Sequence, residues 1–362
     1  MTDLSIPSRP APPTLSVVFP RPRFRRLLTR TLGGLLTALL VLIGLLLVVF
    51  TIGRVLPVDP VVVAIGDRAP QALYDQTFRE MRLDRPLLEQ FAWFALDAVR
   101  GDLGTSITTG NPIGSDLWRF FPATLELSTV AILIGVAFGL PFGLVSVAYF
   151  RKWPDHLTRF LSLIGHSVPV FWLGLVGLLV FYASLGWVGG PGRLDIAYQY
   201  TIPDVTGLVL VDTALAGSLE AFLNALSHIV LPASLLGLIA FGYIARMSRS
   251  FLLWQMRQDY VTVARLKGLS EWTILLRHAL PNALGPILAV IAWTYAFLLE
   301  GAVLTETVFA WPGLGLYMTQ SLFAADVPAV LAGTLIVGAV FLVMNMAAEI
   351  AQSAIDPRIG RQ

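Results

Sequence analysis

The chain has 362 residues, of which 56% are hydrophobic and only 13% are charged, with a formal net charge of +2. A soluble domain of this length cannot hide so large an apolar fraction in one core, so the composition excludes an ordinary soluble protein and indicates an integral membrane protein. The absence of cysteine excludes disulfides, thiolate metal sites and cysteine nucleophiles, and the small net charge gives no reason to expect nucleic-acid binding.

Six apolar stretches are long enough to cross a bilayer as helices, because a hydrocarbon core of roughly 30 Å needs about 20 helical residues. Continuous runs of Leu, Val, Ile, Ala and Gly of this length are helical, unlike the short alternating strands of a barrel. We therefore expect an all-α integral membrane fold with six transmembrane helices. The predicted spans are residues 31–52, 123–150, 160–187, 227–245, 282–300 and 327–350, so that the permeation domain covers residues 123–352.

The distribution of Lys and Arg beside these spans predicts their orientation, since cytoplasmic segments are enriched in both residues. Residues 1–30 carry six arginines against one acid and are rich in proline, which predicts a disordered cytoplasmic tail. With six spans the C-terminal tail, residues 353–362, lies on the same side. The segments 188–226 and 301–326 contain a single base, Arg193, and belong outside. The first apolar stretch lacks a signal-peptide cleavage site and is expected to be an anchor.

Residues 53–122, between the first and second spans, form a more polar segment that is too long for a simple connector and predicts an extracytoplasmic subdomain. Within it, apolar residues from Leu87 to Val99 recur at helical spacing, with Pro86 before them and Gly101 after them. This pattern predicts an amphipathic helix. Its apolar face either packs on the membrane domain or offers a docking surface to an external partner.

The loop of residues 246–281, between the fourth and fifth spans, is the most informative part of the sequence. Residues 255–267 are compatible with a helix, and Gly268 is suited to end it, since glycine adopts positive φ without strain. Ser270 can then cap a second short helix. The loop is expected to form a helix, a turn and a helix at the cytoplasmic membrane face, either as a lever for a partner or as a plain interfacial hairpin.

This loop resembles the shared cytoplasmic motif of the inner-membrane permeases of binding-protein-dependent ABC importers. In that motif an Ala-rich helix precedes a Gly, and a Leu-Pro pair follows. Ala264, Gly268, Leu280 and Pro281 have the same spacing, with the proline thirteen residues after the glycine. The chain departs from the general motif at three positions, namely Thr262 and Val263 in place of Glu-Ala and His278 in place of Ile.

The form of the loop, with Asp259-Tyr260 before Ala264-Arg265, is similar to the dipeptide/oligopeptide/nickel branch of that family. Further segments resemble the same branch, in the same order along the chain. They are residues 83–87, 101–106, 167–174, 306–315 and 356–358. Five such segments in family order are more specific than one short motif, and the resemblance extends from about residue 31 to residue 359.

The resemblance implies a permease subunit of an ATP-driven importer in a bacterial inner membrane, with an ATPase-coupling role for one set of loop residues. That set is Asp259, Tyr260, Ala264, Arg265, Gly268, Leu280 and Pro281. The implied partners are two ATP-binding subunits, a homologous second permease in a heterodimer, and an external solute-binding protein. No cofactor is expected in this chain, because ATP and Mg belong to the partner subunits.

The sequence is consistent with this division of labour. A phosphate-binding loop needs Gly-Lys-Ser/Thr, and neither lysine of the chain, Lys152 or Lys267, follows a glycine. We therefore do not expect this subunit to be an enzyme.

Ionisable residues near the spans are candidates for the solute path, since such groups in lipid are costly and often functional. The candidates are Glu126, His166, Glu300 and Glu349. The alternative for the three acids is a hydrated position near the headgroups, and the alternative for His166 is an interhelical contact. Residues 306–315 form either a re-entrant element beside the path or an ordinary external loop.

Two other functional classes remain to be weighed. A secondary transporter would need paired broken helices and acids or histidines inside the membrane for ion coupling. An intramembrane enzyme would need a reactive constellation, and the sequence contains no HExxH or GxSxG motif. Within the leading class the solute is open, because the family handles peptides, nickel chelates, opines and other small solutes.

Overall fold

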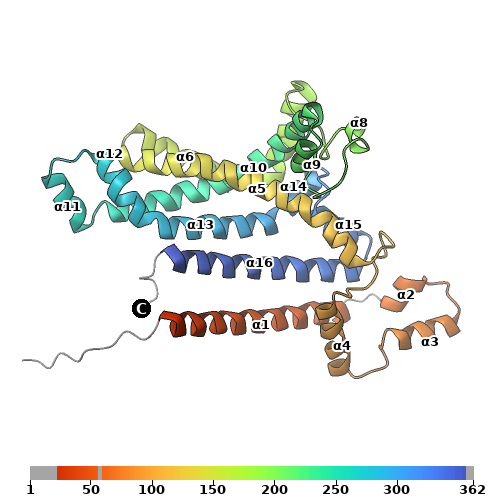
Figure 1. Cartoon of the computed structure of the whole chain (residues 1–362). Coiled ribbons are helices and arrows are strands. Elements are labelled where there is room, and N and C mark those ends of the chain that lie inside the picture. Colours follow the sequence, from red (N-terminus) through yellow and green to blue (C-terminus); the bar gives the residue numbers. More distant parts are fainter. Residues whose placement is uncertain (1–22, 56–58, 356–362) are drawn as a thin grey trace, which may run out of the picture. The chain divides into compact units, whose positions relative to one another are not determined.

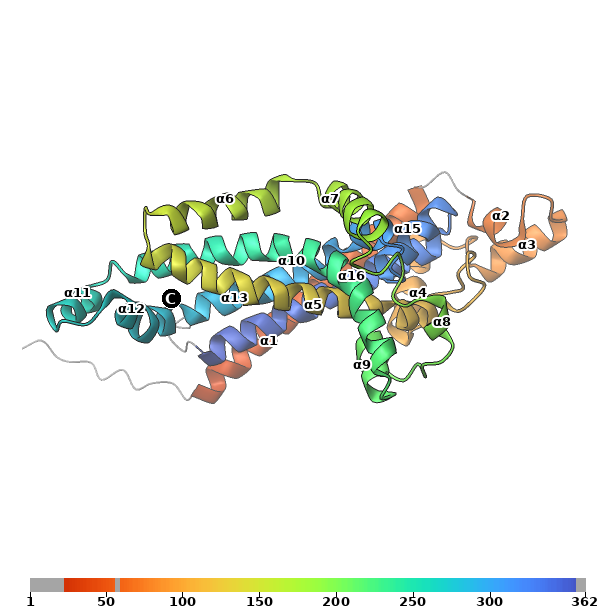
Figure 2. The same ribbon diagram turned by 90° about the horizontal axis from the view of Figure 1, so that it is seen from above.

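The computed structural model describes residues 23–55 and 59–355, and these residues are helical apart from connecting turns and one isolated bridge. Five helical stretches are long and apolar enough to span a membrane, and a bent helix pair raises the number to six if it crosses as one unit. The five stretches are Leu36–Arg54, Ile113–Ala148, Leu219–Gln255, Glu271–Gly301 and Val327–Ala347. The expected all-α membrane architecture is thus present (Figures 1 and 2).

The long helices extend beyond the predicted spans. They are α1 (Arg23–Val55), α5 (Ile113–Ala148), α10 (Leu219–Gln255), α13 (Leu280–Gly301) and α16 (Val327–Ile355). Residues 23–30, which we expected in the tail, are therefore helical, as are residues 113–122 of the predicted outside segment and 246–255 of the predicted loop. The rest of both tails, residues 1–22 and 356–362, lies outside the described residues. A helix does not end where the lipid does, because its backbone hydrogen bonds are satisfied equally well in water.

The third span is not the continuous helix that we predicted over residues 160–187. It consists of α6 (Trp153–Ser167) and α7 (Val170–Gly177), and α7 continues as a π-helix, Leu178–Ser184. The two parts meet at an angle of 93°. Val168 between them is extended, with φ −91° and ψ 130°. The break follows from Pro169, which lacks a backbone N–H and disfavours helical angles at the residue before it.

Helices α5 and α10 pack closely through small residues. Gly135, Gly139 and Gly143 of α5 recur every four residues on one face, and a side chain on any of them would press on α10. A Cβ at Gly139 would lie 3.0 Å from the Cβ of Ile244, and one at Gly143 would lie 3.0 Å from the Cβ of Ser248. Small residues at this spacing let two backbones approach inside a membrane. Close packing is therefore the role of these glycines.

One end of α10 is also tied to α5 and α6 by a buried ion pair that the sequence did not reveal. Arg249 donates from Nε to Oδ1 of Asp155 at 2.7 Å and from Nη2 to Oδ2 at 3.0 Å. Ser146 of α5 donates to the same carboxylate at 2.5 Å. The three helices therefore share one polar junction at the end nearest to α11.

Short helices cluster at the two ends of this bundle, and Figure 1 shows them at opposite ends. At one end lie α11 (Asp259–Leu266) and α12 (Glu271–Ile274). At the other end lie α2 (Pro60–Ile65), α3 (Gln71–Glu80), α4 (Leu87–Arg100), α8 (Ile196–Gln199), α9 (Val209–Leu215) and α15 (Leu314–Phe323), the last preceded by α14 (Val303–Val308). The predicted amphipathic helix is present as α4.

Candidate functional site

The loop between α10 and α13 is built around a small apolar cluster. Val261 and Ala264 of α11 are buried against Ile274 of α12. Helix α12 continues through a π-helix, Leu275–Ala279, into α13. The loop thus has the predicted helix, turn and helix, except that α11 starts only at Asp259 and the second helix is the beginning of the next span. The cluster holds α11 firmly on that span.

The reversal between the two helices depends on Gly268. Its φ is +75°, in the left-handed region that glycine tolerates best, as the sequence led us to expect. The N–H of Gly268 donates to the carbonyl of Arg265 at 2.9 Å, and the N–H of Leu269 donates to that of Ala264 at 3.3 Å. These two bonds form a Schellman motif, which satisfies the last carbonyls of α11. Ser270 then caps α12 by accepting a hydrogen bond from the N–H of Thr273.

Two residues that we predicted as partner contacts are also bonded within the loop. Arg265 donates to both carboxylate oxygens of Glu271, at 2.7 and 3.0 Å, and so clamps α11 to α12. Tyr260 donates from its hydroxyl to Oε1 of Gln255 at 2.8 Å, which joins α11 to the end of α10. Both side chains stay partly exposed. They position the loop whether or not they also touch another subunit.

The outer side of α11 is apolar and uncovered within this chain. Leu266 is 84% exposed, and Val263 and Leu269 are exposed beside it. Sequence analysis did not single these residues out, because their exposure depends on Val261 and Ala264 being the residues that face inward. An exposed apolar surface on a firmly held element is typical of a protein contact.

The remaining predicted loop residues lie at the start of α11 and at the start of α13. Asp259 begins α11 and is exposed. Leu280 begins α13 and packs on a core cluster that includes Leu252 and Leu275, while Pro281 follows it and is exposed. The seven predicted residues thus lie in α11, in the turn after it and at the start of α13.

At the opposite end of the bundle a second polar network centres on Glu126 and Arg193. Nη2 of Arg193 donates to Oε2 of Glu126 at 2.6 Å and to the carbonyl of Gly207 at 2.7 Å. The N–H of Leu210 donates to the other oxygen of Glu126 at 2.7 Å. These bonds pin the segment between α7 and α10 to α5. Arg193 was the only base in its segment, which was the one sequence signal for this pairing.

The turn of residues 309–313 is docked beside this network. The indole N–H of Trp311 donates to the carbonyl of Ala123 at 2.8 Å, and Trp311 is fully buried. Glu306, also fully buried, accepts hydrogen bonds from the hydroxyl of Thr124 at 2.6 Å and from the N–H of Leu316 at 3.0 Å. Burial raises the pKa of Glu306 although these donors oppose the shift. The segment 306–315 is thus an anchored part of the bundle end.

Glu126 and Glu300, the two solute-path candidates whose side chains the structure describes, share no hydrogen bond or ion pair. Glu126 is committed to Arg193, and Glu300 is exposed at the end of α13. The side chains of His166 and Glu349 lie outside the described residues. None of the four assignments is tested by these positions, and they stay predictions. Among the described residues no group of three or more His, Asp or Glu side chains is placed to hold a metal ion.

Comparisons with known proteins decide the family. Residues 131–361, more than half of the chain, match the model of the binding-protein-dependent transport system inner membrane component. This chain belongs to that family. The matched residues include the whole α11–α12 element and the anchored segment around Glu306.

Curated relatives of this permease family are similar over nearly their whole length. The probable D,D-dipeptide transport system permease protein DdpB of Escherichia coli is 43% identical over 89% of this chain and 94% of its own length. The di/tripeptide transport system permease protein DppB of Pseudomonas aeruginosa is 40% identical over 88% of this chain and 95% of its own length. The E. coli dipeptide permease DppB is 35% identical over the same share of this chain. The chain is therefore an inner-membrane permease of the ABC importer class.

A solved structure, an inward-facing form of the MetNI methionine ABC transporter, covers 65% of this chain and 93% of its own chain with 18% identity and a TM-score of 0.47.

Proposed function

We propose that this permease carries di- or oligopeptides, or related small solutes, into a bacterial cell across the inner membrane, driven by ATP hydrolysis on separate subunits. The peptide assignment is supported by the names of its relatives, which refer to dipeptide or di/tripeptide transport. ATP as the energy source is inferred from the family, and its hydrolysis on separate subunits is supported by the lack of a phosphate-binding lysine motif in this sequence. The subunit itself is a transport component and not an enzyme.

The observation that carries the proposal is the construction of α11. Its inner residues are buried against α12 and its ends are fixed by the Schellman turn and the Arg265–Glu271 pair, yet its outer side leaves Leu266 uncovered. Such an element can transmit force, because displacement of α11 must move the start of α13 with it. The ATP-binding subunits, which hold ATP and Mg, would dock on this outer side.

The proposed topology has six spans, of which α6 and α7 together form the third. It places α11, both termini and the loop near Arg151 in the cytoplasm. The helices outside are α2–α4, α8, α9, α14 and α15. This topology is supported by the concentration of Lys and Arg in the N-terminal tail, in the loop near Arg151 and in the loop that contains α11. A homologous second permease and an external solute-binding protein complete the importer, and the outside helices are the surface that the binding protein would meet.

The test exchanges one exposed apolar side chain for a charge. Leu266→Asp should abolish or strongly weaken recruitment of the ATP-binding subunits to the purified permease, because an apolar contact would receive an unpaired carboxylate. Leu322→Asp is the matched control, since Leu322 is also exposed but belongs to α15 at the other end of the bundle. Equal recruitment by the wild type and by Leu266→Asp would overturn the assignment of this surface.

A further inference from the structure

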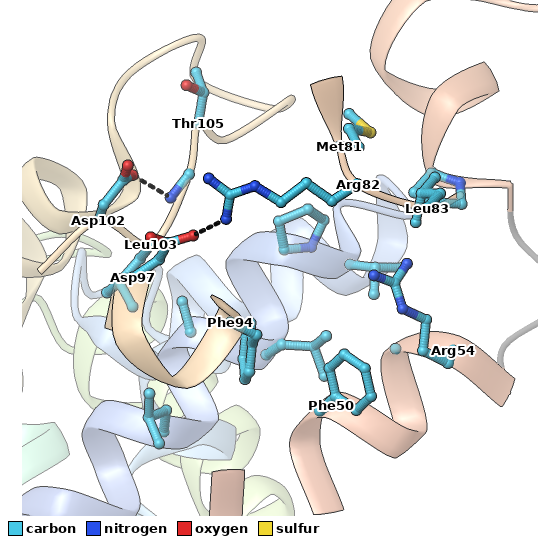
Figure 3. Close-up of a pocket in the computed structure, with 18 of the residues that line it drawn as sticks. Phe50, Arg54, Met81, Arg82, Leu83, Phe94, Asp97, Asp102, Leu103 and Thr105 are labelled. Atoms are coloured by element: carbon cyan, nitrogen blue, oxygen red, sulfur yellow. Dashed lines mark hydrogen bonds and ion pairs between the residues drawn. The ribbon is translucent and has the colours of Figure 1, made fainter. Parts of the chain in front are cut away.

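Helix α4 carries apolar side chains on two sides, and the rest of the chain covers only one of them. On the inner side Phe91 and Phe94 pack against Phe50 of α1, with ring centroids 5.5 and 5.8 Å from that of Phe50. The same side borders a cavity of 580 Å³ between α1, α4 and α16, and Figure 3 shows Phe50 and Phe94 lining it.

Arg82 fixes the rotation of α4 from a second direction. Its guanidinium lies over the ring of Trp93, 4.1 Å from the centroid, and its Nη1 lies 3.3 Å from Oδ2 of Asp97, the contact drawn as a dashed line in Figure 3. Gln90, which is buried, donates from Nε2 to the carbonyl of Arg85 at 2.7 Å. With these contacts the helix cannot turn another face inward.

The remaining side of α4 is an apolar stripe of exposed residues, Leu88, Ala92, Leu96 and Val99. At 100° per residue the four lie within a sector of about 80° around the helix axis. Leu88 is 82% exposed and Val99 is 81% exposed. The charged residues Glu89 and Arg100 flank this stripe on one side. If water surrounded the whole outer side of α4, these exposed apolar side chains would not stabilise the protein.

The position of α4 along α1 indicates what covers the stripe. Phe50, on which α4 packs, lies four residues before Arg54, where the apolar span ends. At 1.5 Å per residue this is about 6 Å inside the end of the span. Figures 1 and 2 show α4 running across the end of α1 and not alongside it. The same turns of α1 leave Leu47, Val48 and Ile52 exposed, so lipid reaches this level of the molecule.

We propose that α4 is an in-plane interfacial helix whose Leu88, Ala92, Leu96 and Val99 stripe lies among lipid acyl chains at the headgroup boundary. An amphipathic helix at this depth buries one apolar side in the bilayer and keeps its charges among the headgroups. The occupant is the lipid bilayer itself and not a protein partner. That the leaflet is the outer one rests on the proposed function, whereas the insertion does not.

The absence of cysteine makes a direct test possible in the full-length chain. Leu88→Cys and Val99→Cys on the stripe, and Glu89→Cys and Arg100→Cys beside it, are labelled with an environment-sensitive fluorophore. Each protein is reconstituted into vesicles of phosphatidylethanolamine and phosphatidylglycerol. Fluorescence is measured with brominated lipid in the bilayer and, separately, with iodide on both sides of the membrane. Each control position directly follows its stripe position in the sequence, and so lies about 100° further around the helix axis.

Labels at Leu88 and Val99 should show blue-shifted emission and loss of fluorescence in brominated lipid, and labels at Glu89 and Arg100 should be quenched mainly by iodide. Iodide quenching of the stripe labels would show that the stripe faces water and would overturn the proposal. Protection from both quenchers would show that protein covers it, and would overturn the proposal equally. Because neither ATP nor solute is present, failure here is distinct from failure of the proposed transport function.

Discussion

Gly268 shows how a single backbone angle organises the candidate coupling element. A Cβ at this position would meet no other atom within 4 Å, so a substitution is opposed only by the positive φ. Gly268→Val should therefore cost about 1–2 kcal/mol at the turn and weaken recruitment of the ATP-binding subunits. Gly268→Asn should be milder, since asparagine visits left-handed angles more readily. Recruitment by the valine variant equal to that of the wild type would show that the turn does not shape the docking surface.

Glu126 and Arg193 form a buried pair that should be sensitive to removal of one partner. Arg193→Ala would leave a buried carboxylate without its cation and should destabilise the protein by about 3–5 kcal/mol. The double variant Glu126→Gln with Arg193→Met removes both charges and keeps an acceptor for the N–H of Leu210, so it should be the more stable of the two variants. The stability of the single and the double variant is measured by thermal unfolding in detergent. A double variant as unstable as the single one would mean that the charge pairing is not the cause.

Glu306 should give the stability of the bundle end a dependence on pH. Its pKa is raised by burial above the ordinary value of 4.5, and it lies between the stretches Glu271–Gly301 and Val327–Ala347 and not within either. A carboxyl group whose pKa is raised by folding contributes most to the stability of the folded state below its pKa in the unfolded chain. This stabilisation is lost as the pH rises through its pKa in the folded state. Relative to Glu306→Gln, the wild-type melting temperature should fall as the pH rises from about 4.5 to 9. A constant difference across that range would contradict the assignment.

At the scale of elements, the packing of α5 on α10 rests on glycine. A Cβ at Gly135 would overlap with Ala240, whereas one at Gly44 of α1 would meet nothing within 4 Å. Gly135→Ala should therefore destabilise the fold by about 1–3 kcal/mol through overpacking. Gly44→Ala, the matched control in another long helix, should be neutral or slightly stabilising. The melting temperatures of the two variants are compared by thermal unfolding. Equal changes in melting temperature would mean that the contact between α5 and α10 can adjust to the extra methyl group.

The elements that the sequence predicted well were those with a strong local signal. Apolar length identified the spans, the Leu87–Val99 periodicity identified α4, and Gly268 with Ser270 identified the reversal. The break at Val168 and Pro169 was not predicted, because proline inside a span permits either a kink or a full break and only neighbouring contacts decide between them. The extra length of α1, α5 and α10 was missed because hydropathy reports lipid contact and not helix continuity.

At the scale of the whole molecule, the family could be identified from motifs in order, but the contacts between distant segments could not. The Asp155–Arg249 and Glu126–Arg193 pairs join residues far apart in the sequence, and even the lone base of its segment, Arg193, does not reveal which acid it meets. The exposed residues of α11 likewise could not be predicted until the structure showed which of its residues are buried. The residues that line the solute path remain predictions for the same reason.

The most direct test of the central claim is transport by the reconstituted importer. The permease, its second membrane subunit, the ATP-binding subunits and the solute-binding protein are placed in vesicles, and uptake of a labelled dipeptide is measured with ATP and Mg or with an imposed ion gradient. The account predicts uptake that needs ATP and the binding protein and is lost with Leu266→Asp. Uptake driven by the ion gradient without ATP would contradict it and would indicate a secondary transporter.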